Sequence, residues 1–335
     1  MNYRRLGNTD LMVSEIGFGC QSISGGLYYK NHAESIKTLL EANNLGVNFF
    51  DTSEHYGEGE SEKLLGKAFK GKRDKIIIGT KAGTLYTASG SAILKLRPLL
   101  RPVAKFLRPM KIQFHQIRAK QKRSNFSTNY IIESVEKSLT RLKTDYIDLY
   151  QLHKPPKFVL ERGEFIDTLE KLKQQGKIRY YGISTAVNEH AFNCFKYSGI
   201  SSVQLMVNLL ENKHVKEILK IAADKEVGII ARNPRAHGHL TNELSDIMAE
   251  TYARNKKEFN MKKGMAAKFK FLVEFNRTLT QAALRYVLGL EGISSVIPRA
   301  VNRIQLKENL DSLKSPQLTE AELIKIHSIQ KLIDC

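Results

Sequence analysis

The chain has 335 residues, of which 42% are hydrophobic and 26% are charged, and its formal net charge at pH 7 is +19. These proportions are typical of a globular protein, and no apolar run reaches the roughly 18 residues that a membrane-spanning helix needs. The cysteines, Cys20, Cys194 and Cys335, form no CxxC pair, which argues against a disulfide framework or a structural zinc site. The first ten residues lack the apolar core of a secretory signal, so we expect a cytoplasmic protein.

Strand and helix patterns alternate along the chain. Residues 3–6 and 15–20 flank a turn-forming segment at 7–10 and predict a hairpin or short strand pair ahead of the first barrel strand. Short β-branched runs predict eight strands, at residues 15–20, 47–51, 75–81, 146–153, 180–184, 202–208, 228–232 and 294–298. Helical periodicity predicts eight helices, at residues 32–45, 61–69, 129–142, 165–175, 189–197, 215–225, 279–288 and 303–313.

Eight βα units in strict alternation favour a closed parallel barrel over an open doubly wound sheet. An open sheet that binds a dinucleotide carries GxGxxG after its first strand, and the GFG at 17–19 and the GEG at 57–59 both lack the third glycine. We therefore predict an α/β fold: one (β/α)8 TIM barrel domain over residues 1–335, with an N-terminal hairpin. An extra C-terminal helix is expected at residues 320–333, after a capping box that runs from Thr319 to Glu322.

Two long connections follow the third and seventh strands, at residues 82–128 and 233–278. Both leave carboxyl ends of strands, so we expect both to lie over the mouth of the barrel, where such loops carry specificity. Between Thr84 and Thr128 there is no Asp or Glu. The first connection holds the cations Lys95, Arg97, Arg101, Lys105, Arg108, Lys111, Arg118, Lys120, Lys122 and Arg123. The second holds Arg254, Lys256, Lys257, Lys262, Lys263, Lys268 and Lys270.

An acid, a phenol and an amine occur at or just past the ends of two predicted strands. Asp51 ends one strand, Tyr56 follows in a glycine-rich loop, and Lys81 ends the next strand. Carboxyl ends of parallel strands share one edge, so these side chains are expected to meet. A buried cation stabilises the phenolate and lowers the pKa of a tyrosine from its usual value of about 10. This arrangement predicts a general acid tuned by its neighbours.

This spacing resembles the aldo-keto reductase family, in which an apolar strand leads to Asp, then four residues and Tyr-Gly. Later strands of the family end in Lys and His, as do GTK at 79–81 and IDLYQLH at 147–153 here. The resemblance implies a catalytic tetrad of Asp51, Tyr56, Lys81 and His153. It implies hydride transfer from reduced nicotinamide to a carbonyl carbon, with Tyr56 protonating the oxygen. Lys81 and Asp51 would set the pKa of Tyr56, and His153 would orient and polarise the carbonyl.

The resemblance also implies a nicotinamide cofactor site. Ser184 matches the family's serine, whose side chain holds the nicotinamide carboxamide. Thr185 stands where the family has the second carboxamide contact, an Asn. The guanidinium of Arg232 could stack on the nicotinamide. The implied cofactor-binding residues are Cys20, Ser184, Thr185, Gln204, Arg232, Pro234, Gly238, Arg299, Gln305, Glu308 and Asn309. Because Arg299 falls where NADPH-preferring relatives carry a cation for the 2′-phosphate, the resemblance implies NADPH in preference to NADH.

Several functional hypotheses stand beside one another. The histidines show no HExxH or paired ligand spacing, so we expect no metal. The filled tetrad favours an active NADPH-dependent carbonyl reductase with a small-molecule carbonyl substrate and no nucleic-acid partner. The first alternative is a nucleotide-binding regulatory or partner protein with little turnover. The second is a reductase held at a membrane surface by the basic residues 95–123. The positive loops also lead us to hypothesise an anionic substrate.

Overall fold

The computed structural model describes residues 1–24, 31–86, 122–185, 187–241, 256–273 and 276–334. Within these residues, one parallel sheet of eight strands has the order β3-β4-β5-β8-β9-β10-β11-β12. Its strands are β3 (Phe18–Gly19), β4 (Phe49–Asp51), β5 (Ile77–Ala82), β8 (Ile147–His153), β9 (Ile178–Ser184), β10 (Ile200–Met206), β11 (Gly228–Arg232) and β12 (Ile293–Ile297). Single parallel bridges join Ile16 to Val296 and Gly19 to Arg299, and so close the sheet. The prediction of a (β/α)8 barrel is confirmed.

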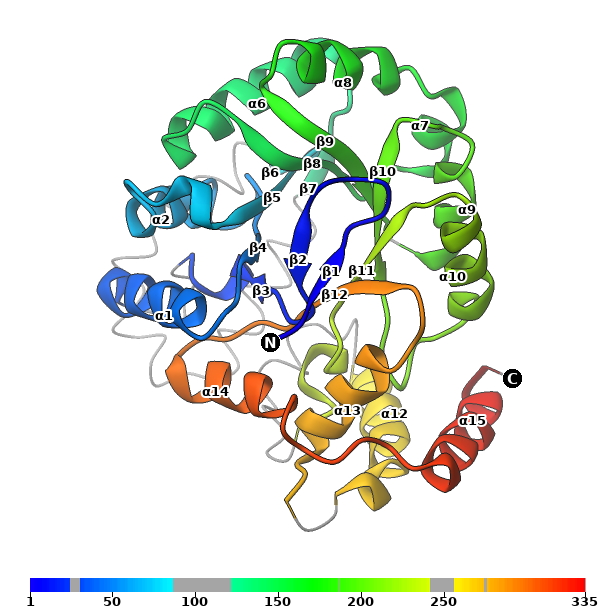
Figure 1. Cartoon of the computed structure of the whole chain (residues 1–335). Helices are drawn as coiled ribbons and strands as arrows, with labels where there is room; N and C mark the ends of the chain where they lie inside the picture. Colours follow the sequence, from blue (N-terminus) through cyan, green and yellow to red (C-terminus); the bar gives the residue numbers. More distant parts are fainter. Residues whose placement is uncertain (25–30, 87–121, 186, 242–255, 274–275, 335) are drawn as a thin grey trace.

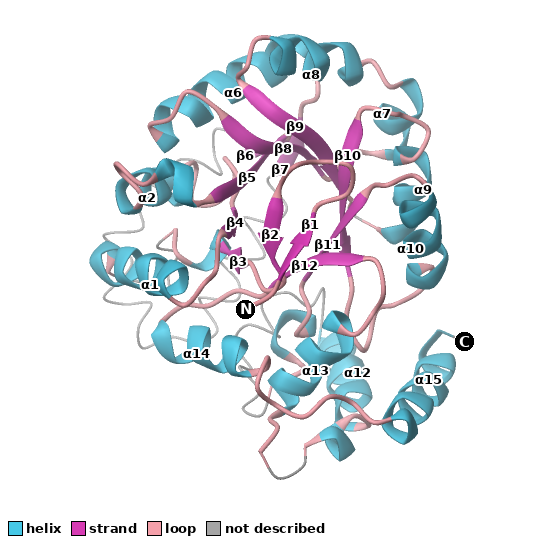
Figure 2. Ribbon diagram, viewed as in Figure 1, coloured by secondary structure: helices cyan, strands magenta, loops and turns pink. Residues whose placement is uncertain are grey.

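The helices surround the strands, as Figures 1 and 2 show. They are α1 (His32–Asn44), α2 (Glu60–Ala68), α6 (Thr128–Leu142), α7 (Lys157–Arg162), α8 (Phe165–Gln174), α9 (Ala191–Cys194), α10 (Val215–Asp224), α12 (Lys256–Ala267), α13 (Leu279–Leu288), α14 (Arg303–Asp311) and α15 (Glu320–Asp334). The predicted capping box is present before α15, because Glu322 N–H donates to Thr319 Oγ1 and Thr319 N–H donates to Glu322 Oε2. The helix expected at 189–197 is shorter than predicted: α9 has four residues, and a 3-10 turn precedes it at Asn188–His190.

An N-terminal hairpin lies across one end of the barrel (Figure 1). It pairs β1 (Tyr3–Arg5) with β2 (Met12–Ser14) in antiparallel register. The assignment of residues 15–20 as a hairpin strand was wrong, because this segment leaves the hairpin and contributes β3, the first barrel strand, at Phe18–Gly19. The turn fixes the pairing, because Leu6 N–H donates to the Leu11 carbonyl at 2.9 Å and so sets residues 12–14 opposite β1.

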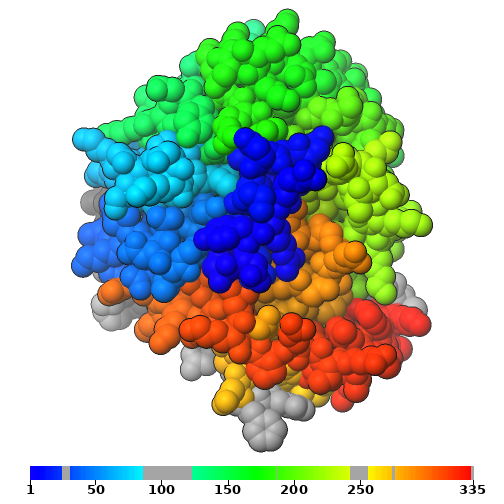
Figure 3. Space-filling model, in the orientation of Figure 1, coloured from blue at the N-terminus to red at the C-terminus, as the bar shows by residue number. Residues whose placement is uncertain are grey.

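The hairpin fills the barrel at the amino ends of the strands. Leu6, Leu11 and Val13 form an apolar cluster with strand residues that include Phe49 and Leu149. In the space-filling view, the hairpin covers the centre of this face (Figure 3). The contacts are buried and apolar, so this end supplies stability and leaves the opposite, carboxyl end for chemistry.

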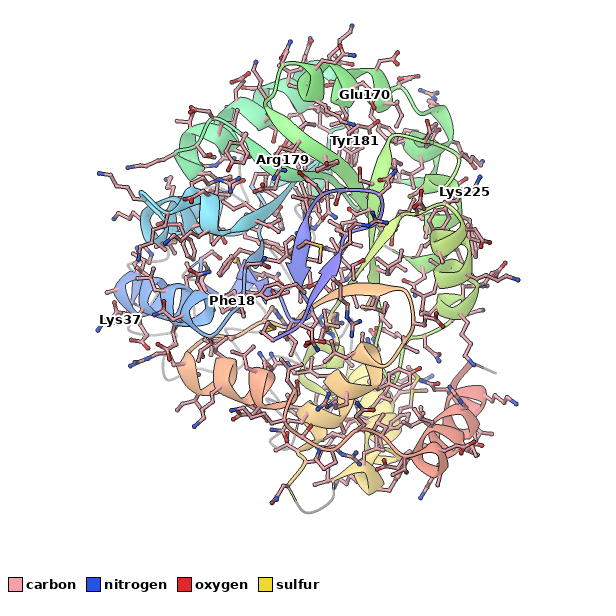
Figure 4. All side chains as sticks on the ribbon, viewed as in Figure 1. Phe18, Lys37, Glu170, Arg179, Tyr181 and Lys225 are labelled. Carbon is pink, nitrogen blue, oxygen red and sulfur yellow. The ribbon has the colours of Figure 1, made fainter. Side chains whose placement is uncertain are left out.

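A charge network around the buried Asp148 ties the hairpin to the barrel wall. Arg179 of β9, labelled in Figure 4, pairs with Asp10 of the hairpin at 2.7 Å and with Asp148 of β8 at 3.0 Å. Asp148 also pairs with Arg73 at 2.5 Å. Because the Asp148 carboxylate is buried between two arginines, removal of Arg73 or Arg179 would leave its charge only partly compensated.

The two long connections leave the carboxyl ends of β5 and β11, as predicted. The first opens with a hairpin that the sequence did not indicate, in which β6 (Thr84–Tyr86) pairs with β7 (Lys122–Ser124). The second contains α12, which was also not predicted. Most of the basic residues expected in the first connection, and the part of the second between 242 and 255, lie outside the described residues.

Candidate active site

Three neighbouring strands deliver polar side chains to one end of the barrel. Asp51 ends β4, Lys81 is the penultimate residue of β5, and His153 ends β8. The registers pair Asp51 with Gly79 and Lys81 with Gln151, so the polar residues stand at similar heights on adjacent strands. Parallel strands thus bring together groups that are about 100 residues apart in sequence.

Lys81 and Asp51 form a buried ion pair. Lys81 Nζ lies 2.6 Å from Asp51 Oδ1, and the two side chains are 0% and 4% exposed. Lys81 Nζ also donates to the carbonyl oxygen of Thr52 at 2.7 Å. Burial lowers the pKa of Lys81 below its ordinary value of 10.5, and the charge of Asp51 opposes this shift by raising it. Asp51 is therefore the group that helps to keep a desolvated ammonium protonated.

Tyr56 stands beside this pair and beside His153. Lys81 Nζ is 5.3 Å from the centre of the Tyr56 ring, and the rings of Tyr56 and His153 meet edge-on with centroids 6.0 Å apart. The loop turns sharply after Tyr56 at Gly57, whose φ is +66° and where a Cβ would lie 2.7 Å from Ser24 Cβ. A side chain at Gly57 would therefore be strained and would push the tyrosine loop outward.

His153 is buried and held by a serine. Its Nδ1 lies 3.1 Å from Ser53 Oγ, which also donates to the carbonyl oxygen of Lys81. Burial lowers the pKa of His153 well below its ordinary value of 6.5, and the charges of Lys154 and Lys81 lower it further. The imidazole is therefore neutral near pH 7.

A chain of hydrogen bonds links the tetrad to the predicted nicotinamide contacts. Ser184 Oγ donates to Gln204 Oε1 at 2.9 Å, and Gln204 Nε2 donates to Asp51 Oδ1 at 2.8 Å. Thr185 N–H donates to the carbonyl of Gln204 at 3.1 Å. Arg232 Nη2 donates to the carbonyl of Thr185 at 3.0 Å. The structure therefore brings these predicted residues together beside Asp51.

Cys20 lies at the same end of the barrel, directly after β3, as the first residue of a 3-10 turn. It is fully buried, and burial raises the pKa of its thiol well above the ordinary value, as does the negative charge of Asp51. The Cys20 thiol is therefore protonated and poorly nucleophilic.

The predicted cofactor contacts Pro234 and Gly238 lie in the loop after β11. Gly238 has a φ of +103°, and its carbonyl oxygen accepts a hydrogen bond from Thr241 Oγ1.

The predicted phosphate contacts lie where β12 leads into α14. Arg299 Nη1 donates to Gln21 Oε1 at 3.2 Å, and Asn309 Nδ2 donates to the carbonyl of Arg299 at 3.2 Å. Asn309 Oδ1 is buried and has no hydrogen-bond partner among the described residues. Gln305 and Glu308 are partly engaged within the protein, because Gln305 Oε1 accepts from Val301 N and Glu308 Oε1 accepts from Thr278 Oγ1.

Sequence reasoning missed a buried carboxylate inside the tyrosine loop. Glu54 accepts from the hydroxyls of Tyr130 and Ser134, both on α6, and from Gly83 N–H at 3.2 Å. Burial raises the pKa of Glu54, and the hydrogen bonds from the α6 hydroxyls and Gly83 oppose this. The sequence contains one indication of this site, because Tyr130 and Ser134 are four residues apart and so share one face of a predicted helix. Ser53, between Asp51 and Tyr56, was also missed.

The described residues contain no grouping of three or more His, Cys, Asp or Glu side chains that could hold a metal ion. Nor does any helix among them combine the length and apolar character needed to cross a membrane.

The model of the aldo/keto reductase family matches residues 15–331. The chain belongs to the aldo/keto reductase family. It is 34% identical to the uncharacterized oxidoreductase YqkF of Bacillus subtilis, over 99% of this chain and 97% of that one. It is 27% identical to an NADH-specific methylglyoxal reductase of Escherichia coli, over 92% of each chain. The solved aldo-keto reductase AKR11C1 from Bacillus halodurans, in its holo form, has a TM-score of 0.77 and 29% identity, covering 98% of this chain and 96% of that one.

Membership in this family makes the chain an oxidoreductase of the class that uses nicotinamide cofactors.

Proposed function

We propose that this aldo-keto reductase reduces an aldehyde or ketone to an alcohol with Tyr56 as the general acid. The observation that carries the proposal is the buried Lys81–Asp51 ion pair, whose ammonium lies 5.3 Å from the centre of the Tyr56 ring. A cation this close favours the phenolate and so makes the phenol a better proton donor.

Each residue then has a distinct task. Bound nicotinamide supplies the hydride, which is chemistry that no side chain provides. Tyr56 donates its hydroxyl proton to the carbonyl oxygen. Lys81 stabilises the phenolate that is left, and Asp51 keeps Lys81 charged. His153, edge-on to the Tyr56 ring, orients the substrate. Burial of the ion pair strengthens these interactions because water does not screen them.

The cofactor fits the residues around this site. Ser184 and Gln204 would orient the nicotinamide carboxamide next to Asp51. The unpartnered, buried Asn309 Oδ1 could accept from the adenine amino group, since a buried acceptor without a partner is costly unless a ligand satisfies it. We propose NADPH as the preferred form, with Arg299 holding the 2′-phosphate. One relative is NADH-specific, so the affinities for NADPH and NADH are compared directly.

The proposal is tested with a panel of carbonyl compounds, which includes sugars and phosphorylated aldehydes, assayed with NADPH and with NADH. We expect cofactor oxidation that depends on both the carbonyl and the protein. Nucleotide binding without turnover of any compound would favour the alternative, a nucleotide-binding partner protein.

A second proposal concerns the charge of the substrate. Burial lowers the pKa of His237 well below its ordinary value. The charges of Arg299, Arg232, Lys262 and Lys154 lower it further, so these positive charges act together near the loop after β11. Such a field concentrates anions. We propose an anionic carbonyl substrate, for which kcat/KM falls with added salt while a neutral analogue is unaffected. Equal salt dependence of the two compounds would exclude it, and binding to anionic vesicles would favour the membrane-surface alternative.

A further inference from the structure

The amino end of the barrel carries a rim of positive charge. The segments that lead into β5, β8 and β9 form this surface, which we call the basic rim and define as residues 70–75, 143–146 and 173–179. These segments hold eight basic residues and two acidic ones, so positive charge dominates. In the space-filling view, the cyan and green parts of the chain border the blue hairpin on this face (Figure 3).

Hydrogen bonds join the three segments of the basic rim to one another. Arg73 Nε donates to Thr144 Oγ1 at 3.1 Å, which links the first segment to the second. Ile147 N–H, directly after the second segment, donates to the carbonyl oxygen of Lys177 in the third at 3.0 Å. Because the segments are in contact, their charges can act on the same partner.

Four lysines of the basic rim are exposed, and their charges are not neutralised by a neighbouring carboxylate. Arg73, Lys177 and Arg179 are each paired with an acidic side chain. By contrast, no ion pair among the residues that the structure describes engages Lys70, Lys72, Lys75 and Lys143. Exposed lysines are common on protein surfaces, so a second feature is needed to identify a partner.

That feature is a group of exposed apolar side chains beside the basic rim, which we call the apolar corner. Its members are large side chains with 37% to 48% of their surface exposed, namely Met1, Tyr3, Met12 and Leu45. The Tyr3 hydroxyl donates to the Gly46 carbonyl at 3.0 Å, and Asn48 Nδ2 donates to the Met12 carbonyl at 2.7 Å. The Asn48 carbonyl accepts from Ile77 N–H at 2.7 Å, so the apolar corner adjoins the segment that leads into β5.

We propose that the amino end of the barrel binds the surface of an anionic lipid bilayer, with the basic rim against the headgroups and the apolar corner at the edge of the acyl chains. Charge complementarity favours such a surface, because each lysine close to anionic lipid strengthens binding. Exposed apolar side chains add to this attraction, and peripheral membrane binding depends on the two together. A nucleic acid would use the charges and leave the apolar corner in water.

This orientation keeps the proposed catalytic site accessible. Asp51, Lys81 and His153 lie at the carboxyl ends of their strands, at the opposite end of the barrel. The mouth of the barrel would therefore face water while the chain is bound to lipid. The alternative contact through residues 95–123 would act from the carboxyl end, where their connection begins, so the two contacts predict opposite orientations.

Tryptophan fluorescence tests whether the apolar corner reaches lipid. The chain contains no tryptophan, so the emission of Leu45→Trp reports that position alone. It is measured with vesicles of phosphatidylcholine, with and without phosphatidylglycerol. We expect a blue shift only with phosphatidylglycerol, and we expect added salt to reverse it. Ile304→Trp, at an 80% exposed position near the start of α14, is the matched control and should keep the emission of a side chain in water.

Charge removal tests the basic rim. One variant combines Lys70→Gln, Lys72→Gln, Lys75→Gln and Lys143→Gln, and its binding to phosphatidylglycerol vesicles is measured by co-sedimentation. Each lysine near an anionic surface contributes about fivefold in affinity, so we expect binding to weaken by roughly 10²–10³-fold. The matched control removes four exposed lysines on and just after α12, and should bind nearly as the wild-type protein does: Lys256→Gln, Lys257→Gln, Lys268→Gln and Lys270→Gln.

Several results would overturn the proposal. One is an unshifted emission of Leu45→Trp on phosphatidylglycerol vesicles. Another is equal weakening in the two lysine variants, because the attraction would then reflect the overall charge of the chain. Binding to RNA without binding to vesicles would assign the basic rim to a nucleic acid instead. A blue shift that depends on protein concentration without vesicles would assign the apolar corner to a contact between copies of this chain.

Discussion

Lys81 Nζ and Asp51 Oδ1 are 2.6 Å apart at the carboxyl ends of adjacent strands, with both side chains almost completely removed from solvent. A buried ion pair rarely adds stability over an apolar pair of equal size, because desolvation of the two charges costs several kcal/mol. This pair is therefore better explained by chemistry than by folding. Its effect on the neighbouring Tyr56 is the basis of the account.

Asp51→Asn removes the charge that supports protonation of Lys81, while the burial that lowers the pKa of Lys81 remains. The ammonium is then lost at lower pH, so the alkaline limb of the kcat profile moves to lower pH. We expect turnover in the alkaline range to fall by roughly 10²-fold, as for loss of a tuned acid. Steady-state rates across pH measure this.

Asp148→Asn is the control for that change. Asp148 is also a buried carboxylate paired with arginines, but it lies near the amino end of β8. This variant should lose stability and keep the wild-type pH profile of kcat. The same displaced profile in both variants would mean that the shift reflects general loosening of the barrel.

Arg299→Ala should weaken NADPH far more than NADH. A lost charge-assisted contact with the 2′-phosphate is worth about 1.5–3 kcal/mol, and NADH has no such phosphate. Fluorescence titration with each nucleotide measures the difference. Arg303→Ala is the matched control. It removes another cation, at the start of α14, whose side chain lies 3.3 Å from Glu34 of α1. Equal weakening of both nucleotides in Arg299→Ala would place the 2′-phosphate elsewhere.

The depressed pKa of His153 predicts a pH-dependent stability. The unfolded chain takes up a proton near pH 6.5, whereas the folded protein resists it to a much lower pH. The stability that comes from the neutral, buried imidazole is thus complete above pH 6.5 and is lost as pH falls below that value. Wild-type protein should lose up to about 1.4 kcal/mol per pH unit more than His153→Gln below this point. Urea unfolding at pH 7 and pH 5 tests this, and identical losses in the two proteins would count against it.

Glu54 should contribute to stability by joining the tyrosine loop to α6. In Glu54→Gln the side-chain NH2 would face a hydroxyl or N–H group whose hydrogen bond the carboxylate now accepts. We expect the free energy of unfolding to fall by about 1–3 kcal/mol. Glu133→Gln, on the exposed face of the same helix, should have little effect. Equal unfolding curves for Glu54→Gln and wild type would show that the contacts are energetically neutral.

The barrel and the meeting of the tetrad side chains could be predicted because they follow from one rule. Eight βα units close a parallel sheet, and its carboxyl ends share an edge, so Asp51, Lys81 and His153 had to converge. The catalytic and cofactor roles of these residues stay predictions, because position alone does not show what a side chain does.

The errors came from pairings between distant segments and from single contacts. No local sequence pattern distinguishes β6 from an irregular loop segment, because its partner β7 begins 36 residues after β6 ends. The hairpin strand was misplaced because residues 12–14 and 18–19 are both extended, and only tertiary packing separates them. Ser53 and Glu54 were overlooked because their importance depends on partners in β5, β8 and α6 that no local pattern reveals.

The most direct test of the central claim is the turnover of Tyr56→Phe beside its affinity for NADPH. The substitution removes one hydroxyl and keeps the ring between Lys81 and His153. If Tyr56 donates the proton, kcat should fall by roughly 10²–10⁴-fold while NADPH binds as it does to the wild-type protein. Turnover at the wild-type rate in a variant that binds NADPH normally would contradict the account.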